Sequence, residues 1–147
     1  MKATILTSVF AVLVSTMNLS ARNVMTYSNV ESGEFGVKKE YVSINKETSK
    51  PESKEYYHYD QNGNIVEKTI SIWNDNTGWE NFATYSYQYG EANKVAYVAY
   101  TKWDKDNERW SDKSDITVHI YNDKDEFLTT KQIQVENKTT FNLISQK

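Results

Sequence analysis

The chain has 147 residues, a formal net charge of −3 at pH 7 and no cysteine. The weakly acidic charge, without a dense run of Lys or Arg, argues against nucleic acid as a partner, because its phosphates require basic groups. The lack of cysteine excludes disulfides, so packing must stabilise the fold, and 11 Tyr, 5 Phe and 4 Trp supply large side chains for it.

Residues 1–21 have the residue order of a secretory signal peptide. Lys2 gives a positive start, an apolar stretch follows up to Val14, and small residues precede Ala21. The apolar stretch is shorter than the roughly 20 mostly apolar residues of a membrane span. We therefore predict cleavage after Ala21. The mature chain, residues 22–147, is then a single β-repeat domain without a membrane span, located in the periplasm, at the cell surface or outside the cell.

The mature chain contains an internal repeat with a period near 30 residues. Tyr59 and Tyr89 are 30 residues apart, Tyr89 and Tyr121 are 32 apart, and Trp73 and Trp103 are 30 apart. The residues that lie six positions after the three tyrosines are Ile65, Val95 and Phe127. Such a period predicts a series of similar supersecondary units.

Each unit is predicted to hold two strands and two turns. Apolar and polar residues alternate with a period of two, as in residues 84–89 and 116–120, and Asp, Asn and Gly bound these runs. The predicted turns are a short one after the Tyr and a longer loop between two Trp. A degenerate earlier copy is predicted from Tyr27, with the polar stretch 45–53 in place of the Trp loop.

One register defect is predicted in the last complete unit. Trp79 and Tyr89 are ten residues apart, whereas Trp110 and Tyr121 are eleven apart. Because one extra residue turns the following side chains to the other face, we predict a β-bulge within residues 111–115.

Successive hairpins favour an all-β fold, an antiparallel meander of about seven or eight strands. The sequence leaves open whether this is an open twisted sheet, a sandwich or a partly closed barrel. Because every second turn of a meander lies at the same end, both Trp loops are expected at one end and the Tyr turns at the other. Residues 139–145 are a candidate for a final strand.

Three features together resemble a family of small secreted proteins of unknown function from Bacteroides and its relatives. The residues that carry the resemblance are the signal segment, the stretch Tyr57–Asn64, and the pairs Trp73/Trp79 and Trp103/Trp110. The resemblance covers roughly residues 23–136. It implies export and a β-rich fold, but no activity, since none is assigned to the family. The stretch Tyr57–Asn64 also resembles the YD repeats of large shell-forming proteins, although its Asp and Gly are not kept in the later units.

Oxygen donors alternate in several loops, as they do in calcium sites. The stretch Asp104–Glu108 is the main example, but it lacks the Gly and the late Glu of an EF-hand. Asp, Asn and Gly are also the residues that hairpin turns require. We therefore predict turns here, and neither a metal site nor a cofactor.

No catalytic residue is predicted. A catalytic nucleophile needs a neighbouring base. The chain has no Cys to serve as the nucleophile, and its only histidines are His58 and His119. Both lie in strand contexts and at different places in their units. We therefore expect a protein that is not an enzyme.

Four tryptophans flank the two long loops and are the candidate binding residues: Trp73, Trp79, Trp103 and Trp110. Their rings could stack on a sugar or anchor a surface protein. Alternatively, they pack across the strands and fix the register of each hairpin. The leading prediction is an exported, non-enzymatic binding or interaction module for a glycan or a protein. The alternatives are a structural protein that assembles through edge strands and, last, an enzyme.

Overall fold

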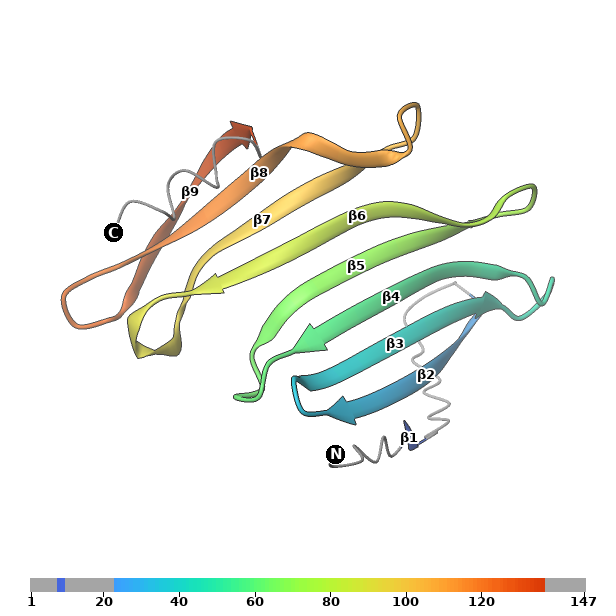
Figure 1. The fold of residues 1–147 in the computed structure, drawn as a ribbon, viewed down its shortest axis with the longest axis horizontal. Helices are drawn as coiled ribbons and strands as arrows, with labels where there is room; N and C mark the ends of the chain where they lie inside the picture. The colour runs from blue at the N-terminus through green and yellow to red at the C-terminus, as the bar shows by residue number, and fades with distance from the viewer. Residues whose placement is uncertain (1–7, 10–22, 137–147) are drawn as a thin grey trace, which may run out of the picture. The chain divides into compact units, whose positions relative to one another are not determined.

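The computed structural model describes residues 8–9 and 23–136 (Figure 1). The strands are β1 (Ser8–Val9), β2 (Val24–Gly33), β3 (Gly36–Asn45), β4 (Pro51–Tyr59), β5 (Ile65–Asn74), β6 (Gly78–Tyr89), β7 (Val95–Asp104), β8 (Arg109–Tyr121) and β9 (Phe127–Glu136), with one 3-10 turn, η1 (Glu91–Asn93). The predicted all-β class is confirmed. The rest of the predicted signal peptide and the candidate strand over 139–145 lie outside the described residues.

Strand order in the sheet follows the order of the chain from β1 to β9, and neighbouring strands are antiparallel. The predicted meander is therefore confirmed. Since β1 and β9 stand at the two ends of this order, the sheet is not closed, and the open sheet is correct among the alternatives that the sequence left.

The chain divides into two compact units, residues 1–82 and residues 83–147, with the boundary inside β6. In the first unit, the β2–β3 and β4–β5 turns lie at one end of their strands and the β3–β4 loop at the other, as antiparallel pairing requires. In the second unit, the β6–β7 and β8–β9 turns lie opposite the β7–β8 loop. That both Trp loops share one end stays a prediction, as does the single domain over 22–147.

Strand ends coincide with the tyrosine positions of the sequence. The three tyrosines are each the last residue of a strand, and the next strand begins six residues later. These strand ends and starts are Tyr59/Ile65, Tyr89/Val95 and Tyr121/Phe127. Tyr27 differs, because it lies within β2, which continues to Gly33. The predicted start of an earlier copy at Tyr27 is therefore wrong.

Little of the described chain is fully buried, and all but one of the buried positions hold small side chains. The residues with the lowest exposure are Ala83, Ser114, Ile116, Ser71 and Thr101. The larger aromatic side chains are mostly half-buried and pack against neighbours on adjacent strands. Cross-strand side-chain pairs are therefore the main packing unit within each part of the chain.

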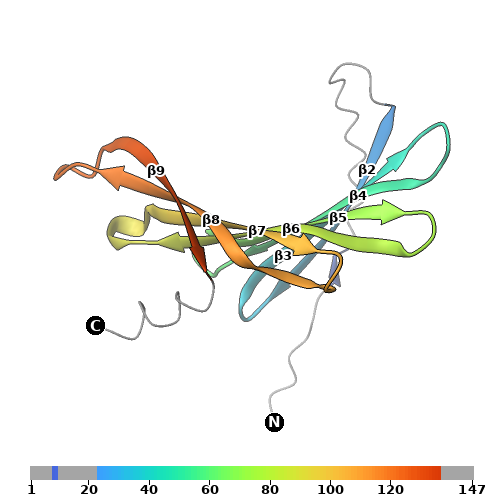
Figure 2. The ribbon, with the colours of Figure 1, turned by 90° about the horizontal axis from the view of Figure 1, so that it is seen from above.

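The second unit contains the predicted β-bulge. Thr101 is opposite Ser114 and Trp103 is opposite Trp110, so residues 111–113 of β8 face a single residue of β7. The predicted location is confirmed, but the bulge holds two extra residues where the sequence suggested one. Figure 2 shows the strong twist from β7 to β9 in this unit, and bulges increase the right-handed twist of the strands that carry them.

Candidate functional site

The first tryptophan pair packs tightly beside the β5–β6 loop. The rings of Trp73 and Trp79 are T-shaped, with centroids 5.2 Å apart and an interplanar angle of 77°. Trp73 Nε1 donates a hydrogen bond of 3.1 Å to Asp75 Oδ1, and Lys54 Nζ lies 5.0 Å from the centroid of Trp79. Both indoles are half-buried. Part of each tryptophan therefore remains exposed.

The second pair has nearly the same geometry. Trp103 and Trp110 are directly opposite each other on β7 and β8, with ring centroids 5.0 Å apart at 81°. Both are half-buried. The contacts in each pair are those expected of aromatic residues that fix the register of a hairpin. A direct role of any of the four in binding stays a prediction.

An open hollow lies beside the first tryptophan pair. Trp73 forms part of an open hollow of about 460 Å³ between the β3–β4 loop and the start of the β5–β6 loop. Its lining residues are Asn45, Thr48, Lys50, Pro51, Glu52, Trp73 and Asp75. The hollow therefore combines one indole ring with hydroxyl, amide, ammonium and carboxylate groups.

Hydrogen bonds hold the walls of this Trp73 hollow in place. Asn45 Oδ1 accepts hydrogen bonds of 3.0 Å from the backbone N–H groups of Glu47 and Thr48, while Asn45 Nδ2 donates to Glu52 Oε1 at 3.0 Å. Lys50 and Asp75 form an ion pair between the two loops. The Lys50 ammonium lowers the pKa of Asp75, so this carboxylate is ionised at neutral pH.

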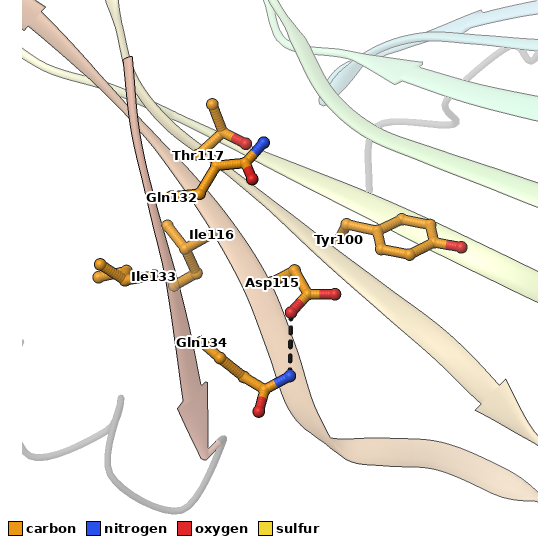
Figure 3. A pocket seen from close by; sticks show the side chains of 7 residues that line it. All are labelled: Tyr100, Asp115, Ile116, Thr117, Gln132, Ile133 and Gln134. Carbon is orange, nitrogen blue, oxygen red and sulfur yellow. Dashed lines mark hydrogen bonds between the residues drawn. The ribbon is translucent and has the colours of Figure 1, made fainter.

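A second hollow lies on the sheet face of the second unit, between β7, β8 and β9 (Figure 3). It measures about 420 Å³ and is lined by Tyr100, Asp115, Ile116, Thr117, Gln132, Ile133 and Gln134. Gln134 Nε2 donates a hydrogen bond of 3.0 Å to Asp115 Oδ1. Sequence reasoning missed these residues, because their proximity depends on the pairing register of three strands that a bulge interrupts.

The loops with alternating oxygen donors use those donors for their own backbone. Asp60 Oδ1 accepts hydrogen bonds from the N–H groups of Asn62 and Asn64, and Asp104 Oδ1 accepts from those of Asp106 and Asn107. The Asn64 backbone hydrogen bond is the main cause that lowers the pKa of Asp60. Within residues 8–9 and 23–136, no three His, Cys, Asp or Glu side chains are grouped to hold a metal. These contacts are the turn chemistry that the sequence predicted.

A polar and aromatic network lies on one face of the first unit. Tyr57 donates a hydrogen bond of 2.5 Å to Glu55, and Lys68 Nζ lies 3.3 Å from Glu55 and 5.1 Å from the Tyr57 centroid. Burial, and then the hydrogen bond to Glu55, raise the pKa of Tyr57. Burial lowers the pKa of Lys68, but Tyr57 and Glu55 outweigh it and the pKa is raised. The network therefore holds a fixed charge pair at neutral pH.

Neither histidine is among the residues that line the two hollows. His58 Nε2 lies 3.3 Å from the carbonyl oxygen of Phe35, and the ring of His119 packs 5.8 Å from that of Phe127. Neither contact is with a nucleophile. In the part of the chain that the structure describes, no helix has the length and apolar character to cross a membrane.

Comparisons with known proteins identify the family but not an activity. Residues 1–121 match the Family of unknown function (DUF3836), and the chain belongs to this family. A DUF3836 family protein from Parabacteroides distasonis ATCC 8503 is 15% identical, with a TM-score of 0.46, over 82% of this chain and 97% of that one. A second, from Bacteroides vulgatus ATCC 8482, is 20% identical, with a TM-score of 0.44, over 74% and 97%. No curated protein has significant similarity to the chain.

Proposed function

We propose that this protein is an exported, non-enzymatic binding module whose Trp73 hollow takes a glycan. The observation that carries the proposal is the position of Trp73, whose half-buried indole lines an open hollow together with polar groups from two loops. An indole offers a flat apolar face beside these groups, and a sugar ring has a matching C–H face and a rim of hydroxyl groups.

The walls of the hollow suit a polyhydroxylated ligand. Asp75 and Glu52 are acceptors for sugar hydroxyl groups, while Lys50 and the Thr48 hydroxyl are donors. The hydrogen bonds of Asn45 and the Lys50–Asp75 ion pair fix the two loops before a ligand arrives. Fixed walls reduce the ordering cost of binding, which supports a binding role.

Export and location are part of the proposal. The order of charge, apolar stretch and small residues in residues 1–21 supports removal of a signal peptide and release to the periplasm, the cell surface or the medium. Mass spectrometry of the protein recovered from the cell envelope tests this directly. We expect a mature N-terminus at Arg22, and recovery of the intact chain in the cytoplasm would contradict it.

A matched pair of tryptophan variants tests the binding site. We expect the purified protein to bind one or more neutral glycans on an array, and Trp73→Ala to weaken that binding about tenfold or more, by loss of the stacking face. Trp103→Ala is the control, because Trp103 belongs to an equivalent pair but lines neither hollow. Equal loss of binding in both variants, with both folded by circular dichroism, would contradict the proposal.

Assembly through β9, the last of the described strands, is a second candidate function. Nine of the ten residues of β9 are exposed, including Phe127 at 56% and Leu128 at 58%. An exposed strand edge can pair with a strand of another copy. Light scattering over a concentration series tests this, with growth of the mean mass above the monomer as the expected result. A constant monomer mass at millimolar concentration would exclude it.

A further inference from the structure

Four side chains form a continuous row across the second unit, one from each of β6, β7, β8 and β9. Tyr85 is opposite Tyr100, Tyr100 is opposite Asp115, and Asp115 is opposite Gln134. Directly opposed residues of antiparallel strands point to the same face. With strands about 4.8 Å apart, the row spans about 14 Å.

Contacts within the row hold its members in fixed orientations. The rings of Tyr85 and Tyr100 have centroids 5.0 Å apart at an angle of 45°. At the other end, the amide of Gln134 donates to the Asp115 carboxylate, which fixes the direction of its oxygens (Figure 3). The row is therefore an aromatic half joined to a hydrogen-bonding half.

A second row on the same face adds more polar groups. Thr117 is opposite Gln132, two residues along from Asp115 and Gln134, and all four line the second hollow. Ile116 and Ile133, which also line the hollow, alternate with these polar residues along β8 and β9, and their row continues to Ala99. The polar and aromatic groups are thus gathered on one face of the unit.

The charge of the hollow limits the ligand class. Asp115 is the one ionisable carboxylate among the lining residues, and no Lys, Arg or His is among them. Among these lining residues, a phosphate, sulfate or carboxylate ligand would meet the Asp115 carboxylate and no compensating cation. A neutral ligand with apolar C–H surface and many hydroxyl donors matches the rings, the carboxylate and the two amides.

We propose that this row, Tyr85–Tyr100–Asp115–Gln134, binds a neutral oligosaccharide laid across the strands. A sugar ring stacks on the tyrosine half, and hydroxyl groups of the next sugar donate to Asp115 and to the Gln134 carbonyl. The choice of a glycan as the ligand rests on the proposed function. The site is different, because it lies on other strands than the Trp73 hollow.

Isothermal titration of the full-length mature protein with four neutral hexasaccharides tests the proposal: cellohexaose, laminarihexaose, xylohexaose and mannohexaose. We expect at least one to bind, and Asp115→Asn to weaken it about tenfold or more, because hydrogen bonds to a charged group are the strong ones. Gln134→Ala is a second, independent variant. Lys131→Ala is the matched control, since Lys131 lies on β9 but is opposite Val118 and on the other face.

The same titrations separate this site from the Trp73 hollow. Loss of binding in Asp115→Asn but not in Trp73→Ala supports the row and overturns the Trp73 hollow as the glycan site. Loss in Trp73→Ala with unchanged binding in Asp115→Asn and Gln134→Ala overturns the row. If the wild-type protein binds none of the four hexasaccharides, the row is not a neutral-glycan site. A loss of binding in Lys131→Ala equal to that in Asp115→Asn would also contradict the proposal.

Discussion

The hydroxyl groups of Thr101 and Ser114 lie 2.6 Å apart, at a directly opposed pair of β7 and β8. Both residues are among the least exposed of the described chain. A hydroxyl pair at this position lets two buried polar groups satisfy each other, because both side chains have little access to water. The pair also adjoins the bulge that separates it from Trp103 and Trp110.

Removing one hydroxyl of this pair should destabilise the protein. Ser114→Ala leaves the Thr101 hydroxyl buried without this partner, and we expect the free energy of unfolding to fall by about 1–3 kcal/mol. Adding Thr101→Val should recover part of that loss, because both polar groups are then gone. Urea denaturation of the two single variants and the double variant measures the coupling, and strict additivity would contradict the hydrogen bond.

The Trp103–Trp110 pair should contribute to stability without being a fully buried core. Because Trp103 is half-buried, we expect Trp103→Ala to cost about 2–3 kcal/mol, below the roughly 3–5 kcal/mol of a fully buried aromatic residue. A double-mutant cycle with Trp110→Ala should show a coupling of about 0.5–1.5 kcal/mol. Unchanged thermal stability in Trp103→Ala would mean that the pair does not hold the hairpin together.

Two neighbouring glycines should respond differently to alanine. Gly36 has φ of +114°, and a Cβ there would lie 1.9 Å from the carbonyl oxygen of Tyr59, so Gly36→Ala should cost about 3 kcal/mol or more. A Cβ at Gly33, at the other end of the same turn, meets nothing within 4 Å. Gly33→Ala is therefore the control, and similar melting temperatures for the two variants would contradict the turn geometry.

The Asp60 turn should give a pH-dependent contribution to stability. Hydrogen bonds from the turn backbone hold the pKa of Asp60 below its ordinary value, so its contribution is present above the unfolded pKa of about 3.9 and is lost as the pH falls through the lower, folded pKa. Asp60→Asn should keep the turn, because Asn122 Oδ1 accepts the equivalent bonds from Lys124 and Glu126. We expect the difference in melting temperature between wild type and Asp60→Asn to shrink below about pH 4. A difference independent of pH would exclude this role.

The sequence predicted those parts of the fold that depend on short-range chemistry. A tyrosine followed by Asp, Asn and Gly marks a strand end, because the fourth residue of the turn needs a positive φ. In two of these turns that residue is Gly63, with φ of +82°, and Asp125, with φ of +61°. The bulge was predictable because one spacing differed from its counterpart. The prediction for Tyr27 was wrong because it used only the spacing of 32 residues to Tyr59, and Tyr27 lies inside β2 and not at a strand end.

The sheet hollow could not be predicted from the sequence for a physical reason. Tyr100, Asp115 and Gln134 lie together only because three strands pair in one register, and a slip of one residue would turn each strand's side chains to the other face. The bulge within residues 111–113 shifts that register by two residues between the Trp103–Trp110 pair and the Thr101–Ser114 pair. The spacing of Trp110 and Tyr121 indicated one extra residue on β8, whereas the observed register requires two.

The indole N–H signals of the four tryptophans provide the most direct test of glycan binding at the Trp73 hollow. The ¹⁵N-labelled protein is titrated with the glycan that binds best on the array, and the four signals are assigned with the single Trp variants. We expect the Trp73 signal to shift most, because its Nε1–H donates a hydrogen bond to Asp75 at the wall of the hollow. The signals of Trp103 and Trp110 should stay in place. A shift of the Trp103 or Trp110 signal without one at Trp73, or no shift at any of the four, would contradict glycan binding at the Trp73 hollow.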